Sequence, residues 1–257
     1  MKGSALRMSN IEDKIKSMDP HSALKYLDSL EESSAKINKL KDKLMKKIAA
    51  IEKEHQRFDK MCFFEKQLYE SGYNLIAGVD EAGRGPLAGP VVAAAVILPK
   101  DIFIENLNDS KKLSEKQREE IYLQIQEKAI AYSVGIVDEK TIDNINILNA
   151  TKHAMKAAIQ SLKVQPEFLL IDALEIDDIP IEQWNIEKGD SLSISIAAAS
   201  IIAKVTRDHM IVELDKKYPQ YGFAKHKGYG TAEHINAIKK FGICPIHRIS
   251  FTKKFIT

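Results

Sequence analysis

The chain has 257 residues, 44% of them hydrophobic, which is enough for one large domain or for a domain with an appendage. Its 38 basic and 36 acidic residues give a net charge of +2, so the charge of the whole chain indicates no particular partner. Two cysteines, Cys62 and Cys244, exclude a disulfide framework and favour a reducing, cytoplasmic setting. We find no apolar stretch typical of a signal peptide or a membrane span, and expect no association with membranes.

The first 70 residues differ from the rest in their pattern. Asp19 followed by Pro20 is typical of a helix start. From Ile37 to Met61 apolar residues recur every three or four positions, which predicts a long amphipathic helix. Its other face is rich in Lys and Arg, and is either a solvated face of a helical hairpin or an arm that faces phosphates. We assign 1–70 to an N-terminal helical accessory region and 71–257 to a second domain.

In the second domain apolar strands alternate with helical patterns. This alternation predicts an α/β domain with crossover connections, followed by a tail of short helices after Pro219. The expected strands cover 75–80, 91–98, 130–138 and 168–172, and the expected helices cover 114–128, about 147–162, and a stretch rich in small residues from Ser193.

Acidic residues stand where several of these elements begin or end. Asp80 and Glu81 close one apolar strand, Asp172 closes another, and Asp190 precedes a helix. Buried acids are costly unless something cationic accompanies them, and a hard divalent cation prefers carboxylate oxygens. Any one of them could be a surface carboxylate or a helix cap, which for Asp190 alone is the better interpretation. Four together indicate a metal site.

A glycine loop, Gly83-Arg84-Gly85, follows the first pair of acids. With Ala88 it matches the dinucleotide-binding pattern G-x-G-x-x-A, and Asp101 lies near the expected distance for a ribose-binding acid. That pattern requires a helix after the glycines to hold the pyrophosphate. Residues 91–98 instead favour a strand, so we disfavour the dinucleotide interpretation.

Several motifs together resemble bacterial ribonuclease HII, in that family's order, over residues 72 to about 250. They are Asp80-Glu81-Ala82-Gly83-Arg84-Gly85-Pro86, Asp109-Ser110-Lys111-Lys112-Leu113, Ile171-Asp172, Lys188-Gly189-Asp190, the run from Ala198 to Asp208, and His226-Lys227-Gly228-Tyr229-Gly230-Thr231. The resemblance implies a ribonuclease H-like mixed sheet flanked by helices, with the N-terminal region as an extension and a C-terminal helical tail.

The resemblance also implies an activity. We expect an endonuclease that hydrolyses the RNA strand of RNA–DNA hybrids and cuts at ribonucleotides embedded in duplex DNA, leaving 5′-phosphate and 3′-hydroxyl ends. Catalysis would use two Mn²⁺ or Mg²⁺ ions. Such an enzyme would act as a cytoplasmic monomer in DNA repair and replication. A non-catalytic nucleic-acid-binding protein with vestigial acids is the remaining alternative.

Site residues follow from the same motifs. The resemblance makes Asp80, Glu81, Asp172 and Asp190 both catalytic and metal-binding, with Asp208 as a rival for the fourth acid. It implies that the substrate is contacted by Gly83, Arg84, Gly85, Ser110, Lys111 and Tyr229. Tyr229 could instead be a core aromatic residue, and Lys111 and Lys112 could belong to a solvated turn. Gly230 stands where the family pattern has Pro, and His226 could shuttle a proton, bind phosphate or only hold its loop.

Overall fold

The computed structural model describes residues 10–30 and 34–256. Residues 1–9 and 31–33, which belong to the predicted accessory region, and residue 257 lie outside the described residues. Contacts between residues divide the chain into two compact units, Met1–Asp59 and Lys60–Thr257. We describe each unit by itself.

The N-terminal unit is helical. Residues 10–16 are helical, and α2 (Pro20–Asp28) and α3 (Ala35–Met61) follow. The side chain of Asp19 accepts hydrogen bonds from the backbone N–H groups of His21 and Ser22, which confirms the predicted helix start. The long amphipathic helix is confirmed as α3.

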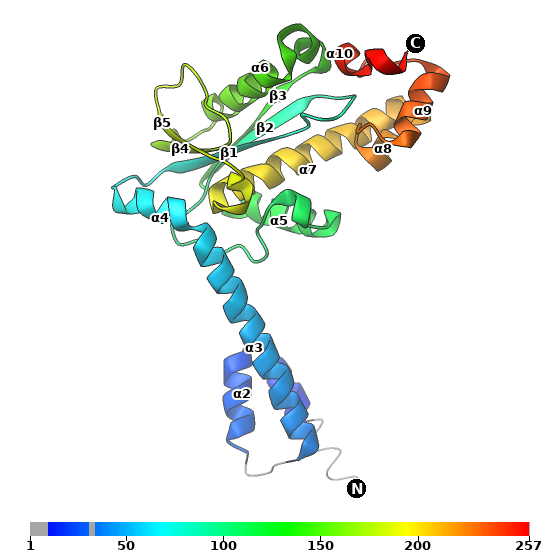
Figure 1. The fold of residues 1–257 in the computed structure, drawn as a ribbon. Helices are drawn as coiled ribbons and strands as arrows, with labels where there is room; N and C mark the ends of the chain where they lie inside the picture. Colours follow the sequence, from blue (N-terminus) through cyan, green and yellow to red (C-terminus); the bar gives the residue numbers. More distant parts are fainter. Residues whose placement is uncertain (1–9, 31–33, 257) are drawn as a thin grey trace. The chain divides into compact units, whose positions relative to one another are not determined.

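The second unit begins with α4 (Phe63–Glu70) and is built around a five-stranded mixed sheet with the order β3-β2-β1-β4-β5 (Figure 1). β1 pairs antiparallel with β2 and parallel with β4, and β4 pairs parallel with β5. The predicted mixed sheet is confirmed. Its strands are β1 (Ile76–Ala82), β2 (Val91–Ile97), β3 (Ala131–Val137), β4 (Phe168–Asp172) and β5 (Glu182–Ile186).

Helices cover both faces of the sheet. α6 (Glu139–Gln160) lies on one face, and α7 (Ile194–Lys217) and α5 (Glu115–Lys128) lie on the other (Figure 1). Ile76, Phe168 and Leu170 pack with Ile196 of α7, and a Cβ atom added to Gly78 would lie 2.0 Å from the carbonyl carbon of Ser195. Small residues therefore let α7 approach β1 closely, as the sequence predicts.

Short elements complete the fold. The predicted helical tail is confirmed, and none of the helices in the described part of the chain is apolar and long enough to cross a bilayer. β2 follows the glycine loop directly, so the loop lacks the helix that dinucleotide binding needs. The short elements are η1 (Ser110–Lys112), η2 (Gly189–Ser191), η3 (Pro219–Tyr221), α8 (Phe223–His226), α9 (Ala232–Phe241), α10 (Ile249–Thr252) and η4 (Lys253–Phe255).

Candidate active site

Two of the predicted acids meet at the ends of neighbouring strands. β1 and β4 run parallel with Val79 opposite Ile171, so Asp80 and Asp172 occupy the next position on each strand. Side chains alternate between the faces of a strand, and both acids share the face on which Phe168 packs with α7. The sheet register thus brings together two carboxylates that lie 92 positions apart in the sequence.

Asp80 is buried, with 4% of its surface exposed, the same fraction as Asp190. Burial raises its pKa well above the usual value, and the carboxylates of Glu81 and Asp172 raise it further. Hydrogen bonds from the side chain of Ser200 and the backbone N–H of Glu81 act in the opposite direction. The site therefore holds a carboxylate whose negative charge is poorly compensated by the protein.

Glu81 carries a similar excess of negative charge. Burial raises its pKa, although Arg84 lowers it through an ion pair of 3.2 Å between Nη1 and Oε1. The other carboxylate oxygen, Oε2, is buried and has no hydrogen-bond partner among the residues that the structure describes. A buried carboxylate oxygen without a donor is costly, and a bound cation would satisfy it.

Asp190 reaches the same region from η2, directly before α7. Asp172 Oδ1 accepts a hydrogen bond of 2.7 Å from the backbone N–H of Gly189, which ties η2 to the end of β4. Burial raises the pKa of Asp172, and the charge of Asp190 contributes to the rise. The ammonium group of Lys111 lies 3.2 Å from Asp190 Oδ2, and it also interacts electrostatically with Asp80. All four predicted acids therefore belong to one electrostatic cluster.

The four carboxylate groups do not converge on a single point in this structure. Within residues 10–30 and 34–256, no three His, Cys, Asp or Glu side chains are arranged to hold a metal ion together. Two of the four acids instead contact cationic side chains, Glu81 through Arg84 and Asp190 through Lys111. The donor chemistry nevertheless suits a hard divalent cation, because the groups are carboxylates, three have raised pKa values, and one oxygen lacks a donor.

The glycine loop and Tyr229 lie next to each other. A Cβ atom added to Gly85 would be 3.8 Å from Cε1 of Tyr229, and the backbone N–H of Leu87 donates to the carbonyl of Gly228. Tyr229 is 43% exposed, so it is not a core aromatic residue. Arg84 and Gly85 are also exposed, which leaves the tip of the loop and the tyrosine ring open to a substrate.

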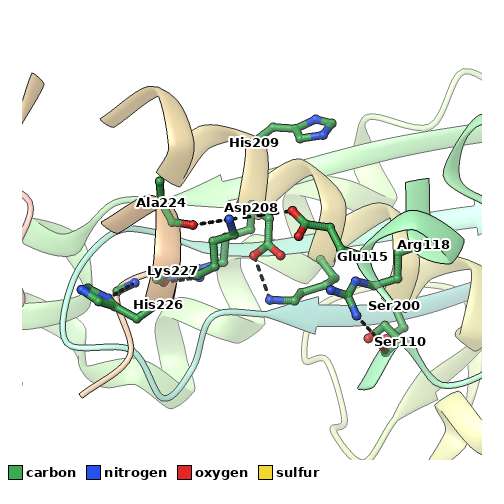
Figure 2. Close-up of polar contacts among 12 residues, drawn as sticks. Ser110, Glu115, Arg118, Ser200, Asp208, His209, Ala224, His226 and Lys227 are labelled. Atoms are coloured by element: carbon green, nitrogen blue, oxygen red, sulfur yellow. Dashed lines mark hydrogen bonds and ion pairs between the residues drawn. The ribbon is translucent and has the colours of Figure 1, made fainter. Parts of the chain in front are cut away.

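Ser110 and Lys111 lie in η1, a 3-10 turn capped by Asp109. Ser110 is buried, and its hydroxyl lies 3.0 Å from that of Ser200 on α7, while Arg118 donates to its carbonyl (Figure 2). Since Ser200 also lowers the pKa of Asp80, this serine lies between η1 and the acidic cluster. The sequence placed Ser200 in a family motif without giving it a role, because an internal helical serine carries no signal of its partners.

Asp208, the rival for the fourth acid, has a different environment. Its Oδ1 lies 2.8 Å from the ammonium group of Lys204, one helical turn earlier on α7, and Figure 2 shows it beside Lys227 and Glu115. Asp208 is thus an ion-paired group. Lys204 also lies 5.9 Å from the ring centre of Tyr229, a contact that the sequence did not predict.

Comparison with known proteins identifies the family. The sequence model of the family Ribonuclease HII matches residues 77–254. A ribonuclease HII from Acetivibrio thermocellus is 61% identical over 252 residues, which cover 98% of this chain and 98% of that protein. The chain belongs to the ribonuclease HII family. The predicted family is therefore confirmed, and the chain is a ribonuclease H endonuclease that acts on RNA–DNA hybrids.

Solved structures agree with the assignment to ribonuclease HII. A ribonuclease H2 from Pyrococcus horikoshii is 29% identical, with a TM-score of 0.58 over 70% of this chain and 96% of that one. Bst-RNase HIII in complex with Mn²⁺ is 20% identical, with a TM-score of 0.54 over 72% and 65%, and shares the fold. The residues before position 77 lie outside the ribonuclease HII family match, although the alignment with the Acetivibrio relative covers nearly all of them.

Proposed function

We propose that this enzyme cuts both RNA–DNA hybrids and duplex DNA that contains single ribonucleotides, by hydrolysis at the acidic cluster. The observation that carries the proposal is the meeting of Asp80, Glu81 and Asp172 at the ends of β1 and β4, where burial and mutual repulsion raise their pKa values. Divalent cations bound among these carboxylates would offset their repulsion.

The residues that would hold divalent cations are the four acids, with Mg²⁺ or Mn²⁺ as the ion. The unpartnered Oε2 of Glu81 supports this assignment, and so does the donor set of carboxylates alone. When bound, two such ions would activate a water molecule and stabilise the leaving 3′ oxygen. Lys111 and Arg84, whose side chains are 80% and 44% exposed, compensate the acids and can turn toward the phosphates of a bound strand.

The Gly83–Gly85 loop would recognise the 2′-hydroxyl group of the substrate. The hydroxyl distinguishes RNA from DNA, and glycine lets the backbone come within hydrogen-bond distance of it. The carbonyls of Gly83 and Arg84 already accept hydrogen bonds from Arg248, so the backbone N–H groups of the exposed residues Arg84 and Gly85 would donate to the 2′-hydroxyl. Tyr229 beside this loop would stack on the following sugar, where a deoxyribose leaves room, and Ser110 and Lys111 would contact the flanking phosphates.

The reaction balances with water as the nucleophile. A water oxygen bonds to phosphorus, the bond from phosphorus to the 3′ oxygen breaks, and that oxygen takes up a proton. The products carry 5′-phosphate and 3′-hydroxyl ends, which polymerase and ligase chemistry can use in DNA repair and replication. With only two cysteines in its sequence, the chain suits a reducing, cytoplasmic setting, and we propose that the enzyme acts there as a monomer.

The test uses duplex DNA with one ribonucleotide, a long RNA–DNA hybrid and an all-DNA duplex. We expect cleavage of the first two with Mg²⁺ or Mn²⁺, none with EDTA, and none of the all-DNA duplex. The new 3′ end should be extendable by a polymerase, and the new 5′ end should be ligatable. A 2′,3′-cyclic phosphate product would contradict water as nucleophile, and hybrid binding without any cleavage would favour a non-catalytic nucleic-acid-binding protein.

A further inference from the structure

A buried arginine close to the C-terminus donates hydrogen bonds to the backbone carbonyl groups of the glycine loop. Arg248 is fully buried, and its guanidinium donates to the carbonyls of Gly89 at 3.0 Å, Arg84 at 2.9 Å and Gly83 at 2.5 Å. Its own backbone N–H donates to the carbonyl of Leu87. Burial lowers the pKa of Arg248 to about 9, which still leaves it charged at neutral pH. Four hydrogen bonds from one residue thus fix the path of residues 83–89.

The preceding residue, His247, holds Tyr229, the second element that faces the substrate, through His234. His234 Nδ1 lies 2.9 Å from the carbonyl oxygen of Tyr229 and His234 Nε2 lies 3.0 Å from His247 Nε2. The backbone N–H of Cys244 donates to His247 Nδ1 at 2.9 Å. Both imidazoles are buried, and burial lowers the pKa of His247 to about 4, so both are neutral at neutral pH.

The shortest contacts favour one direction for each hydrogen bond between Cys244 and Tyr229. A carbonyl oxygen can only accept, so His234 carries its proton on Nδ1 and its Nε2 accepts. His247 Nδ1 lies 2.9 Å from the backbone nitrogen of Cys244, which can only donate, and 3.3 Å from the carbonyl oxygen of Cys244, so the shorter contact makes Nδ1 an acceptor and leaves the proton on Nε2. The two assignments agree at the His234–His247 contact, where one nitrogen donates and the other accepts. Cys244 and His247 therefore orient Tyr229 without any titration at neutral pH.

We propose that His247 and Arg248 are positioning residues that together set the distance between the glycine loop and Tyr229, and thereby the preference for a ribonucleotide at a junction with DNA. Two adjacent residues share one stretch of backbone, so the two elements they hold cannot move independently. The proposal rests on the proposed function, in which these two elements read the substrate.

Arg207 supports the same arrangement from α7. Its Nη2 donates to the carbonyl of Ala88 at 3.1 Å and its Nη1 to the carbonyl of Lys227 at 3.0 Å, so it bridges the same two segments. A Cβ atom on Gly83 would lie 2.2 Å from Nε of Arg207, and Gly83 has φ of +97°. Gly83 is therefore required by the packing under the loop, whatever it contributes to the substrate.

The experiment replaces His247 and measures kcat/KM on two substrates, the duplex with one ribonucleotide and the long hybrid. His247→Leu removes the hydrogen bond to His234. We expect the ratio of kcat/KM on the single-ribonucleotide duplex to kcat/KM on the long hybrid to fall about tenfold, since small displacements of positioning groups cost this much or more. His247→Gln places an amide N–H near the Nε2 position and should keep most of the ratio. His153→Gln, an exposed histidine on α6, is the matched control and should change nothing.

Two further variants separate positioning from folding. His247→Asn reaches only the Nδ1 position, so it should fold and yet lower the ratio as Leu does. In a Tyr229→Ala background, His247→Leu should lower the ratio no further, because coupled residues are not additive. Arg248→Lys keeps the charge but loses the three-carbonyl geometry, and should lower the ratio of the two kcat/KM values as His247→Leu does, with the loss mainly in KM for the single-ribonucleotide duplex.

The outcomes are distinguishable. A wild-type enzyme that cleaves neither substrate would refute the proposed function. An active wild type whose folded His247→Leu and His247→Asn variants keep the wild-type ratio would overturn the positioning role. Equal losses on both substrates for these two variants would overturn it as well, because a general structural role lowers both values together.

Discussion

At the scale of single residues, the acidic cluster distinguishes two aspartates that sequence reasoning could only rank. Asp190 lies 3.2 Å from Lys111 and interacts with Asp172, whereas Asp208 pairs with Lys204 beside Tyr229. We expect Asp190→Asn to lower kcat at least about 100-fold and Asp208→Asn less than about fivefold, because only the first removes charge that would face the metal ions. Steady-state kinetics of both variants on one hybrid substrate test this, and the reverse order would transfer the role to Asp208.

Tyr229 gives a second prediction at this scale. Its ring is exposed beside Gly85, in a position to stack on a sugar of the substrate. Stacking contributes about 1–3 kcal/mol per base in related complexes, so Tyr229→Ala should reduce cleavage of the single-ribonucleotide duplex about tenfold to 100-fold, and cleavage of a long hybrid less. Tyr229→Phe keeps the ring and should retain most activity. Equal losses on both substrates would mean that the tyrosine supports the fold.

At the scale of secondary-structure elements, α4 contributes a buried acid to the start of α7. Glu65 Oε1 accepts hydrogen bonds from the hydroxyl of Ser193 and the backbone N–H of Ser195, in the first turn after η2. Burial raises the pKa of Glu65 above its usual 4.5, and its Oε2 has no partner. A buried acid with a raised pKa costs stability as pH rises through that pKa, because the unfolded chain ionises more readily.

Glu65→Gln should therefore stabilise the enzyme at pH 8 and have a smaller effect at pH 5. The amide keeps an oxygen for both donors and removes the ionisation, so the gain at pH 8 should be on the order of 1 kcal/mol, or about 2–4 °C in Tm. Thermal unfolding of both proteins at the two pH values measures it. Glu65→Leu, which loses both hydrogen bonds, should lower Tm at either pH, and a gain that does not depend on pH would contradict the account.

The elements that sequence patterns predicted are those with a strong period or a cap. Ser114 and Gln117 form a capping box at the start of α5, which was predicted over 114–128, and apolar runs predicted β1, β2, β3 and β4. β5 was missed because it is a largely exposed edge strand, Glu182–Ile186, whose polar residues resemble a loop. The predicted helix at about 147–162 is confirmed, since α6 is broken at Asn146, with φ of +66°, and Asn146 Oδ1 accepts a hydrogen bond from the backbone N–H of Asn149. The helical residues 139–145 before that break were missed.

At the scale of the whole molecule, the N-terminal unit offers positive charge to a nucleic acid. A hollow of about 530 Å³ on this unit is lined by Glu12, Lys36, Lys39, Leu40, Asp42, Lys43 and Lys46. Deleting residues 1–59, the compact unit itself, should weaken binding to hybrid duplex and flatten the dependence of log Kd on log salt, because phosphate contacts release counterions. Removal of residues up to 70 would also take away Glu65, so the shorter deletion is the cleaner test.

The full-length variant with Gln at the four lysines of this hollow is the matched control for that deletion. It should reproduce the smaller salt slope without removing any helix. Binding curves at several salt concentrations measure both proteins. An unchanged affinity and slope would leave the N-terminal unit as a structural or partner-binding element.

Long-range contacts set the limit of what the sequence could predict. The acids and the glycine loop stand in local motifs, so their residues could be named in advance, and the sheet register then explains why Asp80 and Asp172 meet. Arg207 and Arg248 bond to backbone carbonyls more than 100 positions away, and a carbonyl partner leaves no mark on sequence type. The residues that hold the loops therefore emerge only from the folded chain.

The central claim is that the cluster of buried acids performs the hydrolysis. The most direct measurement compares wild type, Asp80→Asn and Asp172→Asn for cleavage and for binding of a hybrid duplex, with thermal unfolding of each. We predict that cleavage falls at least about 1,000-fold while Kd changes less than about threefold, and that Tm rises by a few degrees because a repelled charge is removed. Near-normal turnover of either variant in Mg²⁺ or Mn²⁺ would contradict the account.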